Sequence, residues 1–119
     1  MKKIEAFEKA IAEKADLRTA GINPTAFWAY RKSIDADNQS IDFADCIWEN
    51  EIEEIATCLK ENGIYEFTIS STFSGLISTL AEFEKHGFKM AGLTEVNANY
   101  TDIGTNKRAR IPAIRMLNY

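Results

Sequence analysis

The sequence predicts a mixed α/β fold: a helical hairpin at residues 1–37, then a two-layer sandwich at residues 40–119 with element order βαβαββ. Three observations support this. Apolar residues recur at helical spacing in the first third, the hydrophobic period changes twice between Ile64 and Val96, and two extended segments end the chain. A length of 119 residues, 45% of them hydrophobic, suits a single domain. We expect a small mixed sheet with the two later helices on one face and the hairpin at an end or on that face.

The first third of the chain is predicted to form two helices. One runs from Lys2 to Ala15 and is broken before Gly21. Asn23 as the N-cap and Pro24 in the first helical position open the second. Their apolar faces hold Ile4, Phe7 and Ile11 and then Phe27, Tyr30 and Ile34, with Trp28 nearby.

The middle of the chain predicts alternating strands and helices. A short strand is expected at Ile41–Phe43, followed by a helix with Ile52, Ile55, Ala56 and Leu59 on one face that closes at Gly63. The stretch from Ile64 to Val96 then reads as a strand, a loop, a helix and a strand, which predicts a parallel crossover. Its expected inward residues are Tyr65, Phe67 and Ile69, then Phe73, Leu76, Ile77, Leu80 and Phe83, then Phe88, Met90, Thr94, Val96 and Tyr100.

The last two strands are expected to pair in antiparallel fashion. Asp102, Gly104 and Asn106 supply the turn between them. Pro112 cannot donate a backbone hydrogen bond, so the final strand is expected at a sheet edge or at a bulge. If Ile111–Leu117 is such an edge, its backbone could pair with a second copy and form a homodimer, unless Pro112 and Arg115 prevent that pairing.

Composition excludes several classes of protein. No apolar run is long enough for a membrane span, and the charged start lacks the apolar block of a signal peptide, so we expect a cytoplasmic protein with no membrane partner. Cys46 and Cys58 have no metal-like spacing, and His86 is the only histidine. We therefore expect no metal, no cofactor and no enzymatic activity.

The stretch from Ile41 to Met116 resembles a small bacterial domain family of unknown function, found in genes of commensal bacteria and mobile elements. The loop SSTFSGL and the strand GLTEVNANYTD are the specific parts of the resemblance, and the N-terminal hairpin lies outside it. The resemblance implies a cytosolic bacterial setting and a mobile-element origin. It implies no catalytic residue.

The loop SSTFSG is a candidate anion or nucleotide site. It lies between a strand end and a helix start, where free amides and the helix dipole favour negative charge. The alternative is that Ser71, Thr72 or Ser74 simply caps the helix. The candidate residues are Ser70, Ser71, Thr72, Ser74 and Gly75.

Charge is divided unevenly along the chain, whose net charge is −4. Residues 33–59 hold many carboxylates and no lysine or arginine, whereas the end of the chain is basic. The two segments could each face a partner, or could neutralise each other or be solvated. The candidate acidic interaction face is Asp42, Asp45, Trp48, Glu49, Glu53 and Glu54, and the candidate basic patch is Lys107, Arg108, Arg110 and Arg115.

The sequence thus favours a non-enzymatic accessory or inhibitor protein that binds another protein, for example an anti-CRISPR inhibitor from a mobile element. One alternative is a small anion or nucleotide module at SSTFSG. Another is nucleic-acid binding by the basic hairpin, with Tyr100 and Tyr119 as stacking groups. The sequence pI near 5.0 counts against direct nucleic-acid binding.

Overall fold

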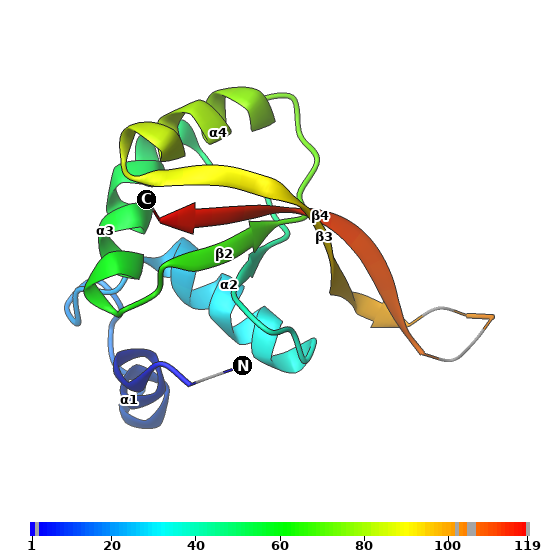
Figure 1. Cartoon of the computed structure of the whole chain (residues 1–119). Coiled ribbons are helices and arrows are strands. Elements are labelled where there is room, and N and C mark those ends of the chain that lie inside the picture. The colour runs from blue at the N-terminus through cyan, green and yellow to red at the C-terminus, as the bar shows by residue number, and fades with distance from the viewer. Residues whose placement is uncertain (2, 102, 105–106, 119) are drawn as a thin grey trace.

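The computed structural model describes residues 1, 3–101, 103–104 and 107–118. Helices and strands alternate after an N-terminal helical part (Figure 1). In chain order the elements are α1 (Glu5–Glu13), α2 (Pro24–Asp35), β1 (Asp42–Phe43), the 3-10 helix η1 (Glu49–Glu51), α3 (Ile52–Glu61), β2 (Glu66–Ile69), α4 (Leu76–Lys85), β3 (Phe88–Thr101) and β4 (Arg108–Asn118). None of the helices in these described residues is long and apolar enough to cross a membrane.

Within the described residues the strands form one mixed four-stranded sheet in the order β1-β2-β4-β3. β1 and β2 are parallel neighbours joined through α3, whereas β4 is antiparallel to both β2 and β3. β2 and β3 therefore run in the same direction, as the predicted crossover requires, but β4 lies between them. The last strand of the chain is therefore an inner strand of the sheet.

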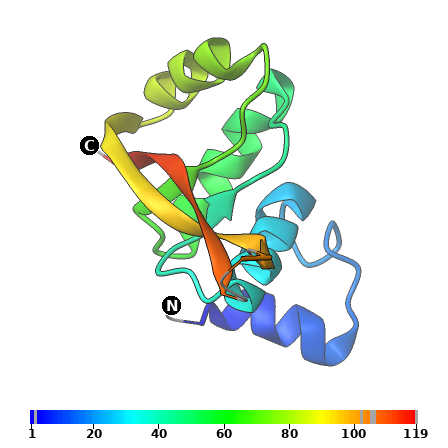
Figure 2. The same ribbon diagram turned by 90° about the vertical axis from the view of Figure 1, so that its right-hand side faces the viewer.

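The helices gather on one side of the sheet (Figure 2). α3 packs against α4, α4 contacts β3, and α2 contacts both β1 and α3. α1 lies farther from the sheet and packs on α2, where the Phe7 ring meets Phe27 at 6.0 Å and Tyr30 at 5.2 Å between ring centroids. This arrangement confirms the two-layer fold class, with the N-terminal helices at the β1 end.

The core is centred on Phe67 of β2. Its ring centroid lies 5.3 Å from Phe43, 5.0 Å from Phe83 and 5.0 Å from Phe88, so it joins β1, α4 and β3. All four side chains are at most 2% exposed. Offset and edge-to-face ring contacts of this kind add to the free energy of burying the apolar surface.

The capping residues in the sequence predicted the start of α2 correctly. Pro24 is its first residue, and the Asn23 side chain accepts a hydrogen bond from the Ala26 amide at 2.9 Å. α1 ends at Glu13, two residues before the predicted end at Ala15, because Lys14 adopts a left-handed conformation with φ of 51° and caps the helix. Lys14 is outside the residue types that usually take this conformation, so this cap was not predicted.

Several predicted inward positions are wrong. Tyr65 is 56% exposed because it precedes the start of β2, and Ile77 on α4 is 82% exposed. The register of β3 against β4 shifts between Met90 and Leu93, where Gly92 has φ of +105°. Met90, before this bulge, and Leu93, after it, are both exposed, whereas Val96 is buried as predicted.

The placement of the last strand at a sheet edge is also corrected, although Pro112 itself lies where β4 has a neighbour on one side only. β4 is an inner strand, and its residues Ile114–Leu117 pair with β2 while other β4 residues pair with β3. Pro112 lies beyond the end of β2 and pairs with Glu95 alone, so its missing amide is tolerated on the side without a neighbour. Most of Ile111–Leu117 is therefore unavailable for the expected pairing with a second copy.

The tip of the hairpin is only partly described. The turn residues Asp102 and Asn106, and the proposed stacking residue Tyr119, lie outside the described residues. Tyr100, the other proposed stacking residue, is 62% exposed on β3.

Candidate functional site

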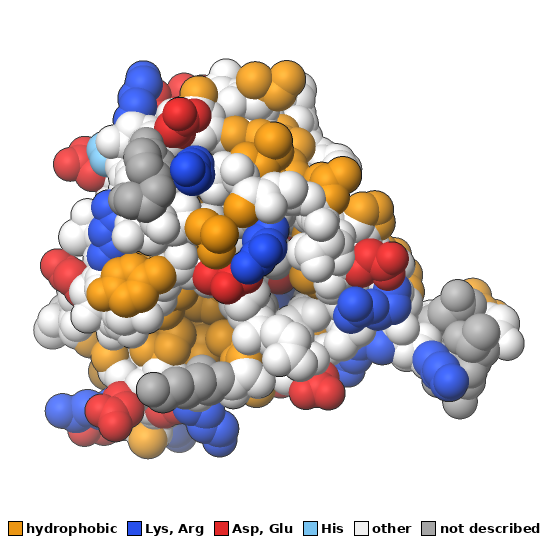
Figure 3. Space-filling view, in the orientation of Figure 1, with side chains coloured by type: hydrophobic (Ala, Val, Ile, Leu, Met, Phe, Trp, Pro, Cys, Tyr) orange, Lys and Arg blue, Asp and Glu red, His pale blue; other side chains and the backbone are white. Residues whose placement is uncertain are grey.

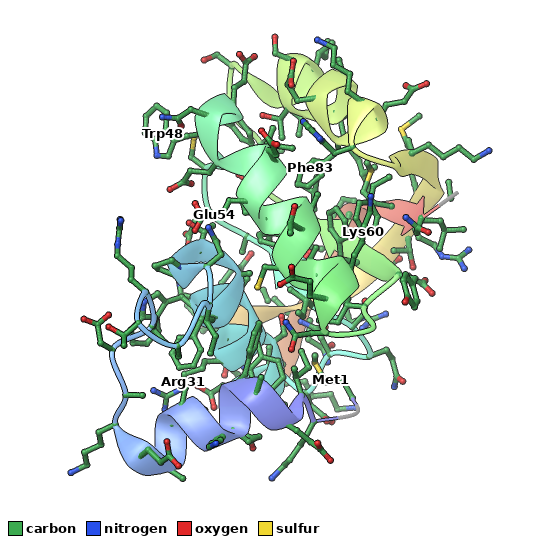
Figure 4. The ribbon with its side chains drawn as sticks, turned by 90° about the vertical axis from the view of Figure 1, so that its left-hand side faces the viewer. Met1, Arg31, Trp48, Glu54, Lys60 and Phe83 are labelled. Carbon is green, nitrogen blue, oxygen red and sulfur yellow. The ribbon has the colours of Figure 1, made fainter. Side chains whose placement is uncertain are left out.

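Most of the predicted acidic face is exposed on the loop after β1 and at the start of α3. Glu49 begins η1, and Glu53 and Glu54 lie in the first turn of α3. Trp48 is 65% exposed, although tryptophan at this spacing is more often found in a core. Trp48 and Glu54 project from the same part of the molecule (Figure 4).

A second tryptophan joins this face from α2. Trp28 is 52% exposed and lies with Trp48 in the lining of a hollow of about 420 Å³. We call this hollow the tryptophan hollow. Asp45 and Glu51 also line it, and the Glu51 carboxylate accepts a hydrogen bond from the Thr25 hydroxyl at 3.2 Å.

A neighbouring hollow of about 360 Å³ lies between the start of α2 and α3. Its acidic lining residues are Glu53, Glu54 and Glu61, and Asn50 contributes an amide. We call it the glutamate hollow. The two hollows together define an acidic–aromatic surface made of Trp28, Asp45, Trp48, Glu49, Glu51, Glu53, Glu54 and Glu61.

The negative charge of this surface is largely uncompensated. Among the described residues of segment 35–54, only Asp45 forms an ion pair, with Lys32 Nζ at 2.5 Å from its Oδ2. Two arginines of the predicted basic patch pair outside that segment, Arg110 with Glu95 and Arg115 with Glu66. These two ion pairs therefore do not neutralise the acidic segment.

Asp42 is a correction to the predicted acidic face, because it is only 5% exposed. Its Oδ1 accepts a hydrogen bond from the Thr68 hydroxyl and its Oδ2 accepts one from the Ser70 hydroxyl, both at 2.6 Å. Its amide donates to the Ser33 hydroxyl at 2.8 Å. Asp42 therefore joins α2, β1 and the end of β2 inside the molecule.

Asp42 also lines a small pocket of about 220 Å³, which we call the Asp42 pocket. The pocket lies where the parallel strands β1 and β2 end, between the end of α2 and the β3–β4 hairpin. Ligands of α/β proteins often bind beyond the carboxyl ends of parallel strands. Its other lining residues are Lys32, Ser33, Asn38, Ala44, Ser70, Asn97, Ala98, Tyr100 and Ile111.

The SSTFSG loop does not cap α4 with a side chain. The N-cap residue is Gly75, without a side-chain hydrogen bond, so capping by Ser71, Thr72 or Ser74 is wrong. The amides of Ser70 and Ser71 both donate to the Phe43 carbonyl, at 3.2 and 3.3 Å, and are already used within the sheet. Of the five candidate anion-binding residues, Ser70 is the one that lines the Asp42 pocket.

The predicted basic patch is divided. Arg108 donates to the Asp35 carbonyl at 2.9 Å, and Arg110 donates to the Asn97 side chain at 2.9 Å, so both brace the hairpin. Arg115 lies far along β4 and pairs with Glu66 at 2.7 Å. Lys107 is exposed beside the turn. On the face seen in Figure 3, acidic and basic side chains are interspersed, whereas hydrophobic side chains gather over α4 and the loop before it.

Groups suited to covalent or metal chemistry are isolated. Cys58 is 4% exposed on α3, and burial raises the pKa of its thiol above the ordinary value. Cys46 is exposed in the loop before η1. The described residues contain no cluster of histidine, cysteine and carboxylate side chains that could hold a metal ion.

The sequence could have indicated part of what it missed. Trp28 stands one position from the apolar Phe27, outside the three-residue spacing of the buried face, which is a signal of exposure. The grouping of Asn38 and Asn97 beside Asp42 had no such signal, because those residues are distant in the chain and meet only when the hairpin curls toward α2.

A family model described as Domain of unknown function (DUF7698) matches residues 25–118. The chain belongs to this family. The DUF7698 match starts in α2, so it takes in more than the predicted resemblance over Ile41 to Met116 and includes the whole sheet together with Trp28. Comparisons with curated proteins and with solved structures found no match.

Proposed function

We propose that this DUF7698 protein is a non-enzymatic bacterial protein that acts by binding a basic partner protein through its acidic–aromatic surface. The observation that carries the proposal is the exposure of two tryptophans, Trp28 and Trp48, around one hollow beside uncompensated carboxylates. Exposed tryptophans at the centre of a surface are frequent hot spots of protein interfaces. The carboxylates would steer and orient a partner rich in lysine and arginine.

An inhibitor of a nucleic-acid-binding protein is the specific form that we favour. A row of carboxylates on η1 and α3 presents negative charge to a groove that normally holds phosphates. This form places the protein in the cytoplasm, with an origin in a mobile element. It predicts that the partner's nucleic acid and this protein compete for the same groove.

The test is affinity capture from bacterial lysate, read by mass spectrometry and then repeated with the purified partner. We expect wild type to retain a partner that is lost by a Trp28→Ala, Trp48→Ala variant and by a Glu53→Lys, Glu54→Lys variant. Loss of one hot-spot side chain alone should weaken binding about thirtyfold or more. Raising the salt concentration should slow association, because exposed charges are screened.

The matched control is Glu5→Lys with Glu13→Lys, which makes the same charge change at two exposed positions of α1. Circular dichroism establishes that each variant is folded. If the control loses the partner as fully as the Glu53→Lys, Glu54→Lys variant does, only the total charge of the protein matters for binding. Capture unaffected by both surface variants would refute the proposal.

A further inference from the structure

We propose that the Asp42 pocket binds a protonated primary amine. This inference is independent of the proposed protein partner, because it concerns a different hollow. The Asp42 pocket and the tryptophan hollow share only Lys32, Asp42 and Ala44 in their linings. An amine site could therefore exist whether or not the acidic–aromatic surface binds a protein.

The first argument is the missing countercharge of Asp42. A buried carboxylate is costly unless a cation and hydrogen bonds compensate it. The Thr68 and Ser70 hydroxyls supply two hydrogen bonds, but within the described residues Asp42 has no ion-pair partner. Each carboxylate oxygen has a further lone pair with which it could accept from an ammonium group.

The second argument is that the cations near the pocket are already engaged. Lys32 Nζ pairs with Asp45 at 2.5 Å, and Arg110 Nε pairs with Glu95 at 3.8 Å. Arg108 donates to the carbonyls of Ala98 and Asp35. These three positive groups thus have other acceptors, and none of them pairs with Asp42, although Lys32 also lines the pocket.

The third argument is the shape and lining of the pocket. A volume of about 220 Å³ suits one ammonium group on a short carbon chain rather than a nucleotide. Ala98 and Ile111 offer apolar contact to such a chain, and the Tyr100 ring can lie against the cation. Asn38 and Asn97 hold each other, because the Asn97 amide donates to Asn38 Oδ1 at 2.7 Å and Asn38 Nδ2 donates to the Asn97 carbonyl at 3.0 Å. These two hydrogen bonds join the end of α2 to β3 on one side of the pocket.

Nuclear magnetic resonance titration of isotope-labelled protein tests the inference with four probes: n-butylammonium, N-acetyl-lysine amide, n-butanol and acetate. We expect saturable shifts of the Asp42 carboxyl resonance with the two amines at millimolar concentration, and none with butanol or acetate. Tighter binding of N-acetyl-lysine amide would identify a protein lysine side chain as the source of the amine. Tighter binding of butylammonium would identify a free small amine.

Two variants locate the site. Asp42→Asn should weaken amine binding at least about tenfold, because a charge-assisted hydrogen bond is lost. Asp35→Asn removes the same charge from an exposed position of α2 and should leave binding unchanged. Tyr100→Leu changes a side chain that is 62% exposed, so folding is not at risk, and it should weaken binding about two- to fivefold.

Three results would overturn the inference. One is the absence of saturable shifts in wild type with either amine. Another is binding of butanol or acetate as tight as that of the amines. The third is amine binding of unchanged affinity in Asp42→Asn or, if that variant does not fold, of unchanged affinity in Tyr100→Leu.

Discussion

Burial sets the chemistry of individual residues in this protein, as the two cysteines show. Cys46 is exposed, whereas Cys58 packs in the core on α3 and is 4% exposed. Burial raises the pKa of the Cys58 thiol because the thiolate would lose its solvation. The thiolate is the reactive form, so the two thiols should differ strongly in reactivity.

We predict that iodoacetamide modifies Cys46 in the native protein and modifies Cys58 only after unfolding, as mass spectrometry of the peptides would show.

The raised folded-state pKa of Cys58 also determines in which direction its contribution to stability changes with pH. Its contribution to stability is complete below the unfolded-state pKa and is lost as pH rises through the folded-state pKa. Above about pH 8.5, the free energy of unfolding should therefore fall less steeply in Cys58→Ala than in wild type. Equal slopes, or rapid labelling of native Cys58, would contradict this assignment.

Asp42 is a charged residue that the sequence predicted on the surface but that the structure buries. Its apolar neighbours Ile41 and Phe43 alternate with it along the predicted strand, so a strand with one solvated face was the natural expectation. The second face is instead covered, because Ser33 of α2 and Thr68 of β2 meet Asp42 there. Only the tertiary structure brings those hydroxyls together.

At the scale of elements, one contact network fixes the hairpin to the end of α2. Asn38 and Asn97 exchange two hydrogen bonds, and Asn97 Nδ2 also donates to the Ala36 carbonyl at 3.0 Å. Arg108 of β4 reaches the Asp35 carbonyl at the end of α2. The hairpin would otherwise have few contacts beyond its own ladder, because β2 ends at Ile69.

We predict that Asn38→Ala lowers the free energy of unfolding by about 2 kcal/mol, because two backbone groups of Asn97 lose their partner. Amide hydrogen exchange should accelerate in the outer hairpin more than around Phe67. Gln39→Ala, an exposed neighbouring change, is the control for chemical denaturation and exchange. Uniform acceleration across the whole sheet would show that Asn38 stabilises the fold globally and does not specifically hold the hairpin.

For the whole molecule, the decisive feature is that the last strand is an inner one. β4 is bonded to both β2 and β3, and its Met116 is fully buried. α1 is peripheral by comparison, because its buried Phe7 meets the aromatic rings of α2 rather than the sheet. The family match, which begins at residue 25, also leaves α1 outside.

We therefore predict different results from truncation at the two ends. Removal of residues 1–20 should leave a cooperatively unfolding domain, less stable by about 2–4 kcal/mol because the rings that meet Phe7 become exposed. Removal of residues 108–119 should abolish cooperative unfolding, because β2 and β3 lose their shared neighbour. Circular dichroism during thermal denaturation distinguishes the two. A folded protein without β4, or an unfolded one without α1, would contradict this ranking.

The sequence by itself determined the fold class, the order of the elements and the start of α2, because hydrophobic period and capping act over a few neighbouring residues. It also determined that Phe67 and Phe83 are core residues and that the later acidic residues lie exposed near Trp48. Strand order, the bulge at Gly92 and the burial of Asp42 were decided only by the tertiary structure. Each depends on which distant segment pairs or packs with another, and that choice minimises the free energy of the whole chain rather than of any local stretch.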